Sequence, residues 1–235
     1  MGDEVMDLPT LAAYLQRDVR DVSRLASRGY LPGQRVGGEW RFHRAEINHW
    51  IETQMHAYTE EELERLEKGA NSRLDDGPLL SSLLSEETVV VPLLASSRTS
   101  VLRGLVQAAE QSWQVHDPEA VLNAVTAREE MGSTALATGV AIPHPRRPLP
   151  NALGESVMAY ARTTTGIPFG GPPGSLTDIF FLVLCRDDRT HMRVLARLSR
   201  LMLRPQFLDD LRAAETPADT LQVIEDAERD LFAQD

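Results

Sequence analysis

Cysteine, long hydrophobic runs and positive charge are all scarce in this 235-residue chain. The single cysteine, Cys185, excludes an intrachain disulfide and fits a reducing compartment, and its apolar surroundings predict an inert core thiol. The longest apolar run, residues 179–185, is too short to span a bilayer. The first residues lack the basic and apolar segments of a signal peptide. We therefore expect a cytoplasmic protein without membrane insertion.

The charge balance is acidic, with 24 Lys and Arg against 35 Asp and Glu and a net charge of −11. This balance argues against general coating of nucleic acid or anionic membranes, but it allows a local basic face. The sequence has no Gly-Lys-Ser/Thr phosphate loop, so we expect no nucleotide cofactor. His43, His49 and His56 are spaced by six and seven residues. No pair of them can chelate a metal from one helix face, and we expect no metal site there.

Residues 1–55 alternate short helical patterns with turns. Asp7 and Asp18 stand where the first two helices need an N-cap, and Gly29 supplies a left-handed residue after the second. Gly37 and Gly38 suit a two-residue turn between extended arms. The stretch RAEINHWIETQM then has the apolar spacing of an amphipathic helix. These features predict a helix-turn-helix, a hairpin wing and a closing helix.

The order of these features, with RGYLP, RVGGEWRF and EINHWI in succession, resembles the excisionase/MerR-type DNA-binding domain. In that family the second helix enters the major groove and the wing contacts the DNA backbone. The resemblance implies a DNA face formed by Arg20, Ser23, Arg24, Arg28, Arg35 and Arg41. Asp21 departs from the family, which usually has a small polar residue there, and its carboxylate would repel phosphate.

Two interpretations of this N-terminal segment stay open. Residues 1–55 contain seven Arg and eight Asp or Glu, so they have no net basic excess. The first interpretation is DNA binding through a one-sided stripe, which needs a homodimer or a second site because a lone small module binds weakly. The second is that the module keeps the fold and binds protein.

Residues 56–79 form the expected linker between two domains. Leu63 and Leu66 repeat at helical spacing, so the first half predicts a helix. The Gly, Asn, Ser and Asp-Asp-Gly-Pro residues that follow predict a solvated segment.

Residues 80–235 predict an α/β fold. ETVVVPL and IFFLVLC have the composition of buried strands, and ESVMAYAR alternates. Helical patterns occupy TSVLRGLVQAAEQ, DPEAVLNAVTAREE, HMRVLARLSRLM and TPADTLQVIEDA. Helices interspersed with buried strands indicate a layered sandwich, a mixed sheet covered by helices.

The stretch REEMGSTALATGVAIPHPR contains the candidate chemistry. Pro143 and Pro145 restrict the backbone on both sides of His144. A neutral imidazole can accept and release phosphate at physiological pH, and nearby cations stabilise the charge of the transferring group. The amides and hydroxyls of the Gly-Ser-Thr turn predict an anion cradle.

This stretch, followed by FFLVLC, THMRVLARLSRLM and FLDDLRAAETPADTLQVI, resembles the type 2 IIA components of the bacterial phosphotransferase system, the fructose, mannitol and nitrogen-regulatory class. The resemblance implies that His144 accepts phosphate, that Arg128 is the active-site arginine and that His191 lies beside His144. Ser133 and Thr134 would complete the pocket rim. Pro145 departs from the family, where a small residue is frequent, and removes one amide donor.

The combination suggests a histidine phosphocarrier that regulates. The implied partners are a phosphohistidine donor protein of the phosphotransferase system, DNA, and a IIB or regulatory protein. In the first hypothesis, phosphorylation of His144 controls DNA binding or dimerisation of the N-terminal domain. In the second, the chain is a non-phosphorylated IIA-like adaptor or transcriptional regulator. The third is a component of sugar import.

Overall fold

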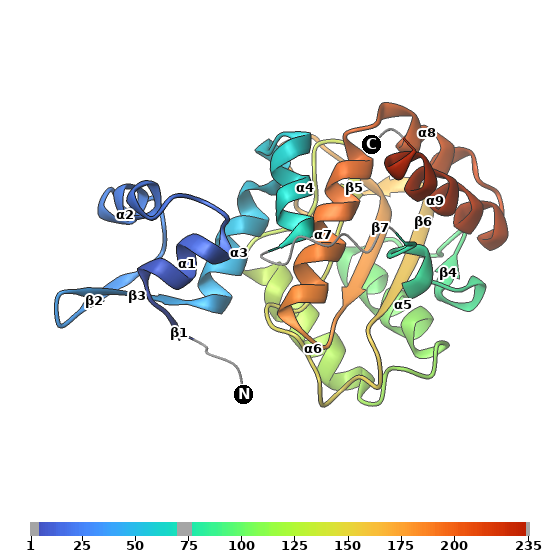
Figure 1. Cartoon of the computed structure of the whole chain (residues 1–235). Helices are drawn as coiled ribbons and strands as arrows, with labels where there is room; N and C mark the ends of the chain where they lie inside the picture. Colours follow the sequence, from blue (N-terminus) through green and yellow to red (C-terminus); the bar gives the residue numbers. More distant parts are fainter. Residues whose placement is uncertain (1–4, 70–76, 234–235) are drawn as a thin grey trace. The chain divides into compact units, whose positions relative to one another are not determined.

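A computed structural model describes residues 5–69 and 77–233, which belong to two compact units (Figure 1). The first unit comprises residues 1–75 and 195–203, and the second comprises residues 76–194 and 204–235. The boundary at residues 75 and 76 falls within the expected linker. The solvated segment predicted there lies largely in residues 70–76, outside the described residues.

The first unit contains a small antiparallel sheet and short helices. Its elements are β1 (Val5–Met6), α1 (Leu8–Tyr14), α2 (Val19–Ser27), β2 (Gln34–Val36), β3 (Glu39–His43), α3 (Arg44–Gln54), the 3-10 turn η1 (Met55–Ala57) and α4 (Glu60–Lys68). The strand order is β1-β3-β2. Its core includes the buried side chains of Met6, Leu11, Val22, Phe42, Ile47 and Ile51. The predicted helix-turn-helix, wing and closing helix are all present.

Local side-chain chemistry sets the ends of these elements. Asp7 Oδ1 accepts a hydrogen bond from Thr10 N at 2.9 Å, and Asp18 Oδ1 accepts one from Arg20 N at 2.7 Å. Both aspartates are the N-caps that the sequence predicts. Gly37 and Gly38 have φ values of 61° and 88° and join β2 to β3, as a two-residue primed turn requires.

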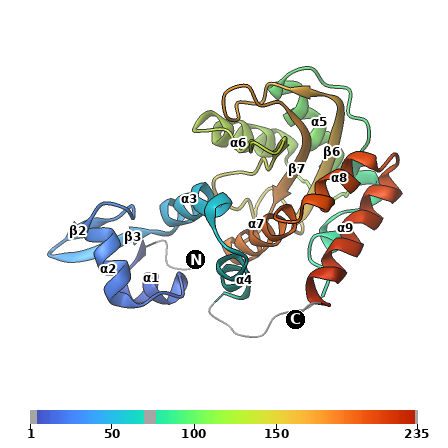
Figure 2. The same ribbon diagram turned by 90° about the horizontal axis from the view of Figure 1, so that it is seen from above.

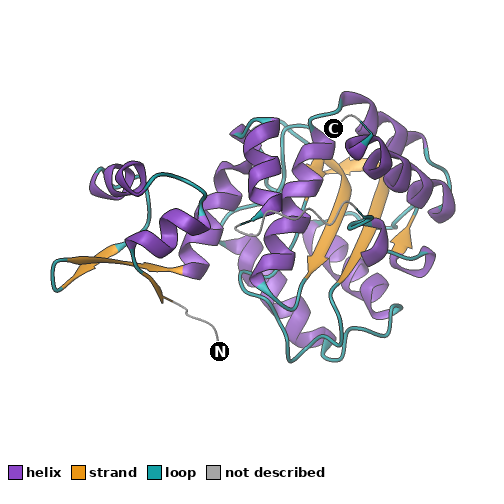
Figure 3. Ribbon diagram, in the orientation of Figure 1, coloured by secondary structure: helices purple, strands orange, loops and turns teal. Residues whose placement is uncertain are grey.

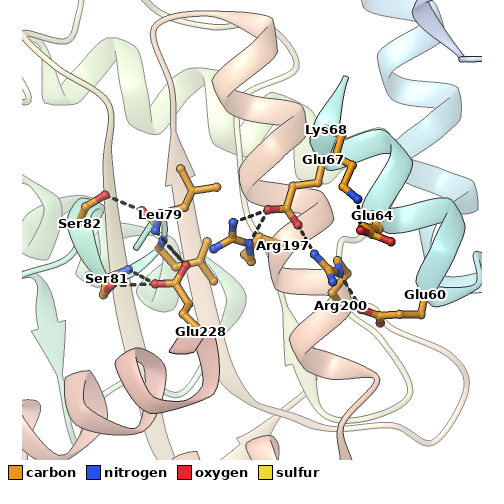
Figure 4. A network of polar contacts seen from close by, with 11 residues as sticks. Glu60, Glu64, Glu67, Lys68, Leu79, Ser81, Ser82, Arg197, Arg200 and Glu228 are labelled. Atoms are coloured by element: carbon orange, nitrogen blue, oxygen red, sulfur yellow. Dashed lines mark hydrogen bonds and ion pairs between the residues drawn. The ribbon is translucent and has the colours of Figure 1, made fainter. Parts of the chain in front are cut away.

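Helix α4 is the helix predicted in the linker, but it is not solvated on all sides. Thr59 and Glu62 form its capping box. Leu63 and Glu67 are buried. Glu67 accepts hydrogen bonds from Arg197 Nε at 2.6 Å and Arg200 Nη1 at 2.9 Å (Figure 4). The first half of the expected linker is therefore a packed helix of the first unit.

The second unit is built on a four-stranded mixed sheet (Figure 3). Its elements are the 3-10 turns η2 (Ser81–Leu83) and η3 (Glu86–Thr88), β4 (Val89–Val90), α5 (Arg98–Glu110), α6 (Pro118–Glu130), β5 (Val140–Ala141), β6 (Val157–Ile167), β7 (Thr177–Leu184), α8 (Pro205–Ala213) and α9 (Pro217–Phe232). Helix α7 (Asp188–Met202) starts in this unit, and its residues from 195 onward belong to the first. The strand order is β4-β6-β7-β5, with β6 and β7 antiparallel and both edge strands parallel to their neighbours.

Helices cover both faces of this sheet. Figure 2 shows α5 and α6 on one side of β6 and β7, and α8 and α9 on the other. β7 is buried over nearly all of its length and β6 is buried from Val157 to Ala161, which explains the apolar sequences of these two stretches. The predicted layered α/β sandwich is confirmed. Among the residues that the structure describes, no helix combines the length and the apolar character needed to cross a membrane.

A buried carboxylate fastens the beginning of the second unit to its last helix. Glu228 on α9 accepts hydrogen bonds from the amides of Leu79 at 3.0 Å and Leu80 at 2.9 Å (Figure 4). It also accepts from the amide of Ser81 at 3.0 Å and from its hydroxyl at 2.7 Å. Four donors compensate the cost of burying this charge.

Candidate functional site

His144 stands just beyond a short edge strand. β5 pairs with β7 in parallel, with Val140 opposite Ile179. After the strand, Val183 N donates a hydrogen bond to Pro143 O at 2.9 Å, one residue before His144. Proline on both sides further limits the backbone. The sheet therefore fixes the direction from which the His144 side chain leaves the backbone.

One ring nitrogen of His144 is engaged by its own segment. Nδ1 lies 2.8 Å from the carbonyl oxygen of Ile142. Because a carbonyl oxygen only accepts, this contact assigns the proton to Nδ1. In the neutral ring Nε2 then carries the lone pair, so Nε2 is the nucleophilic nitrogen. The His144 side chain is buried.

The structure brings His191 beside His144. Their ring centroids are 5.1 Å apart, and their planes are inclined by 59°. His191 lies in the first turn of α7, and its amide donates to Asp187 O at 3.1 Å. Asp187 also caps this turn, since its carboxylate accepts from Thr190 N at 2.9 Å and from Thr190 Oγ1 at 2.8 Å. The first turn of a helix favours nearby negative charge, which suits a phosphoryl group.

Arg128 and Glu129 end helix α6, and both are buried. Arg128 Nη1 donates to Gly132 O at 2.9 Å. The Glu129 carboxylate accepts from Thr134 N at 3.3 Å and from the Thr134 hydroxyl. These two side chains thus hold the turn that follows the helix. Glu129 has no recognisable role in the sequence alone, and its burial and its hydrogen-bond partners mark it as a positioning residue.

The hydroxyls of the Gly-Ser-Thr turn have protein acceptors. Ser133 Oγ donates to Phe169 O at 3.0 Å and accepts from Ala135 N at 3.2 Å. The Thr134 hydroxyl donates to Glu129, as described above. A phosphoryl group would have to compete for both, so the anion cradle stays a prediction. Within the second unit, the part of the chain that the structure describes holds no three His, Cys, Asp or Glu side chains close enough to share a metal ion.

An ion pair between Arg212 and Asp178, which the sequence did not reveal, lies beside the start of β5. Arg212 on α8 donates to both Asp178 oxygens, at 2.9 and 3.1 Å, and to Thr138 O at 2.8 Å. The hydrogen bonds with Asp178 raise the pKa of the Arg212 guanidinium. Gly139, just before β5, has a φ of +87°, and a Cβ there would lie 2.9 Å from Asp178 Oδ1. The glycine of GVAIPH therefore allows this ion pair to approach the strand that leads to His144.

The predicted DNA-binding residues lie on α2, at its C-terminal end and on the β2–β3 wing. Arg20, Arg24, Arg28 and Arg35 are exposed, and Ser23 and Arg41 are half-buried. These are the elements that face DNA in the domain that the sequence resembles.

Several of these arginines already have neighbours of opposite charge or aromatic character. Arg24 Nη1 lies 3.3 Å from Asp21 Oδ1, and Arg41 Nη2 lies 2.7 Å from Glu39 Oε2. The Arg35 guanidinium lies 5.0 Å from the ring centroid of Trp40. The two carboxylates reduce the positive potential of this face.

Comparison with known proteins agrees with both parts of this description. The family model "Phosphoenolpyruvate-dependent sugar phosphotransferase system, EIIA 2" matches residues 82–227, and a helix-turn-helix domain model matches residues 5–55. A nitrogen regulatory protein of Bradyrhizobium diazoefficiens is 31% identical over 138 residues, which cover 57% of this chain and 87% of that relative.

Two further comparisons add a relative and a fold. The fructose-specific EIIABC component of Bacillus subtilis is 23% identical over 147 residues, which cover 62% of this chain but only 23% of that relative. The crystal structure of the nitrogen regulatory protein IIA-Ntr from Neisseria meningitidis has a TM-score of 0.56 at 22% identity, covering 62% of this chain and 99% of that structure. Because the first family model spans more than half of the chain, this protein belongs to the EIIA 2 family of the phosphoenolpyruvate-dependent sugar phosphotransferase system, and it carries an N-terminal helix-turn-helix domain.

Proposed function

We propose that this protein is a regulatory phosphocarrier that accepts a phosphoryl group on Nε2 of His144. EIIA domains of this family are phosphocarriers. The observation that supports the residue most directly is the pairing of the His144 and His191 rings, 5.1 Å apart, with Nδ1 of His144 on the Ile142 carbonyl. Pre-setting the tautomer removes one step of reorganisation before transfer.

The transfer requires little covalent chemistry from the protein. The bond between phosphorus and nitrogen of a donor phosphohistidine breaks, and its electron pair stays on the donor ring. The lone pair of His144 Nε2 forms the new bond to phosphorus, while Nδ1 keeps its proton and continues to donate it to the Ile142 carbonyl oxygen. That hydrogen bond stabilises the positive charge that the His144 ring gains.

The other site residues are proposed to act on charge and position. Arg128 supplies a permanent cation near the end of α6, and His191 supplies a ring nitrogen for the phosphoryl oxygens. Ser133 and Thr134 are proposed as rim residues whose hydroxyls change partner when phosphate binds. The phosphate comes from a phosphohistidine donor protein, and a IIB or regulatory protein is its further partner.

The helix-turn-helix domain extends this proposal to regulation. A phosphoryl group adds a charge of about −1.5 to −2. We propose that this charge changes DNA binding or dimerisation of the N-terminal domain and so links carbon or nitrogen status to transcription. In the alternative, the helix-turn-helix domain and the EIIA domain of this chain together act as a protein adaptor or transcriptional regulator without phosphorylation. The ion pairs of Arg24 and Arg41 favour that alternative, because they weaken a DNA-facing surface.

Intact-mass analysis after incubation with phosphoenolpyruvate and the general phosphotransferase proteins tests the proposal. We expect the wild type to gain one phosphate and His144→Ala to gain none. The matched control is His116→Ala, which removes an exposed histidine of the same unit and should still gain one phosphate. A folded wild type that gains no phosphate supports the adaptor, and phosphate on His144→Ala places the acceptor elsewhere.

A further inference from the structure

An exposed aromatic residue beside a groove in the second unit is not used by the histidine site. The groove, here called the Trp113 groove, has a volume of about 500 Å³. Its walls come from the segment around η2 and η3, from the turn after α5 and from the start of β6. It is lined by Ser82, Leu83, Leu84, Ser85, Glu87, Thr88, Gln111, Ser112, Trp113, Gln114, Glu155, Ser156 and Val157.

The backbone of Trp113 has a left-handed conformation, which tryptophan rarely adopts. Its φ is +61°, in the left-handed region, and its amide donates to Glu110 O at 3.0 Å where α5 ends. Glycine or asparagine is the usual residue at such a helix end, because a bulky side chain is strained there. The Trp113 side chain is also 87% exposed, so no burial compensates for the strain. A strained and exposed tryptophan is typical of a binding site rather than of a structural residue.

The charge of the Trp113 groove is of one sign. Among the described residues that line it, Glu87 and Glu155 are the ionisable ones, and none of these lining residues is a lysine or an arginine. A hydrogen bond with Ser85 lowers the pKa of Glu87, which is therefore ionised at neutral pH. Glu155 lies 3.9 Å from Arg186 in an exposed pair, which is weak and easily exchanged for another cation.

We infer that the Trp113 groove binds a basic segment of a partner protein in which arginine or lysine alternates with aliphatic residues. A guanidinium can stack on the Trp113 indole, and neighbouring cations can pair with Glu87 and Glu155. Leu83 and Leu84 are half-buried and offer apolar contact to the aliphatic side chains between them. The groove includes none of the proposed phosphoryl-transfer residues, so this inference does not rest on the proposed phosphate transfer.

Titration of the full chain with the peptide acetyl-RLRLRL-amide tests this inference, with acetyl-ELELEL-amide as the charge-reversed probe. The readouts are calorimetry and the indole N–H resonance of Trp113, which is assigned by its loss in Trp113→Gly. We expect the basic peptide to bind and to shift this resonance, and the acidic peptide to do neither. Trp113→Gly should weaken binding roughly five- to tenfold, as the loss of a cation–π contact and its apolar area predicts.

Matched variants separate a specific groove from general attraction to an acidic chain. Glu87→Gln/Glu155→Gln should weaken binding, whereas Glu215→Gln/Asp230→Asn removes the same charge at exposed positions outside the groove and should leave it within about twofold. Trp113→Gly should not unfold the chain, because glycine relieves the strain, and its thermal midpoint should equal or exceed that of the wild type. Three outcomes would overturn the inference. The first is equal weakening of peptide binding by both double variants, and the second is unchanged peptide affinity in Trp113→Gly. The third is a shift of the Trp113 resonance by a neutral hexose and not by the peptide.

Discussion

Arginine has opposite environments in two regions of the first unit. Where α4 packs on α7, the Arg197 and Arg200 side chains have exposed fractions of 0% and 3% and share the buried carboxylate of Glu67. On α2, the Arg24 side chain is 62% exposed, beside an Asp21 side chain that is 56% exposed. Buried charges need their partners, whereas exposed pairs contribute little to stability. The first region therefore governs folding, and the second remains available to a charged ligand.

The largest effect is expected at the buried region. Glu67→Gln should lower the free energy of unfolding by about 3 kcal/mol or more, because it leaves two buried guanidinium groups without their shared charge. Burial alone would lower the pKa of Arg200, but hydrogen bonds with Glu60 and Glu67 raise it overall. Arg200 keeps its hydrogen bond with Glu60 in the variant. Urea denaturation and hydrogen exchange of residues 60–68 measure the loss.

Glu64→Gln is the matched control on the same helix. Glu64 pairs with Lys68 in a partly exposed place, and such a pair contributes about 1 kcal/mol or less. The hydrogen bond from Lys68 lowers the pKa of Glu64 from 4.5. Its small contribution is therefore present above pH 4.5 and is lost as the pH falls through the folded-state pKa. Equal losses of stability in the two variants would remove the distinction between fully buried and partly exposed charge.

The contrast between these regions also explains what the sequence could predict. The caps Asp7 and Asp18 and the Gly37-Gly38 turn act over three residues or fewer, so their partners are visible in the sequence. Helix α4 was predicted from Leu63 and Leu66. The burial of Glu67 was not predicted, because its partner Arg197 lies 130 residues away in the sequence.

The histidine site also combines features that the sequence predicts with features that only the structure shows. The strand before His144 and the prolines beside it are evident in GVAIPHP, and the pairing of His144 with His191 was implied by family resemblance alone. The positioning groups Glu129, Asp178 and Arg212 were not assigned. From the sequence alone, these polar residues look the same as solvent-exposed ones. The burial of Glu129 and the bidentate contact between Arg212 and Asp178 distinguish them in the structure.

Arg212 provides an intermediate case, with its side chain 34% exposed and that of Asp178 26% exposed. Asp178→Asn should lower the free energy of unfolding by about 1 kcal/mol, since two charge-assisted hydrogen bonds are weakened in a partly solvated place. It should also slow phosphorylation of His144, because the strand that leads there loses its support. The slowing should stay well below the roughly hundredfold cost of a misplacement of about 1 Å.

Asp226→Asn is the control for this prediction, because it makes the same substitution in an exposed pair with Arg229 on α9. We expect a change in stability of less than about 0.5 kcal/mol and an unaltered phosphorylation rate. The two variants are compared by urea denaturation and by the time course of intact mass. If Asp178→Asn is destabilised but transfers phosphate at the wild-type rate, the ion pair stabilises the fold without positioning His144.

The smallest effect is expected on α2, and its sign distinguishes a DNA face from a protein-binding face. Asp21→Asn removes a carboxylate beside Arg24, so its affinity for a random-sequence DNA duplex should rise roughly two- to fivefold at low salt. Arg20→Ala should instead weaken binding and reduce the salt slope by about one. Fluorescence anisotropy across a salt series measures both.

Neither substitution should change stability by more than about 1 kcal/mol, because both side chains are exposed and Asp21 loses only a favourable contact with the first turn of its helix. Opposite changes in affinity at nearly constant stability would place the exposed arginines on a DNA-binding surface, and two unchanged affinities would favour a protein partner for this face.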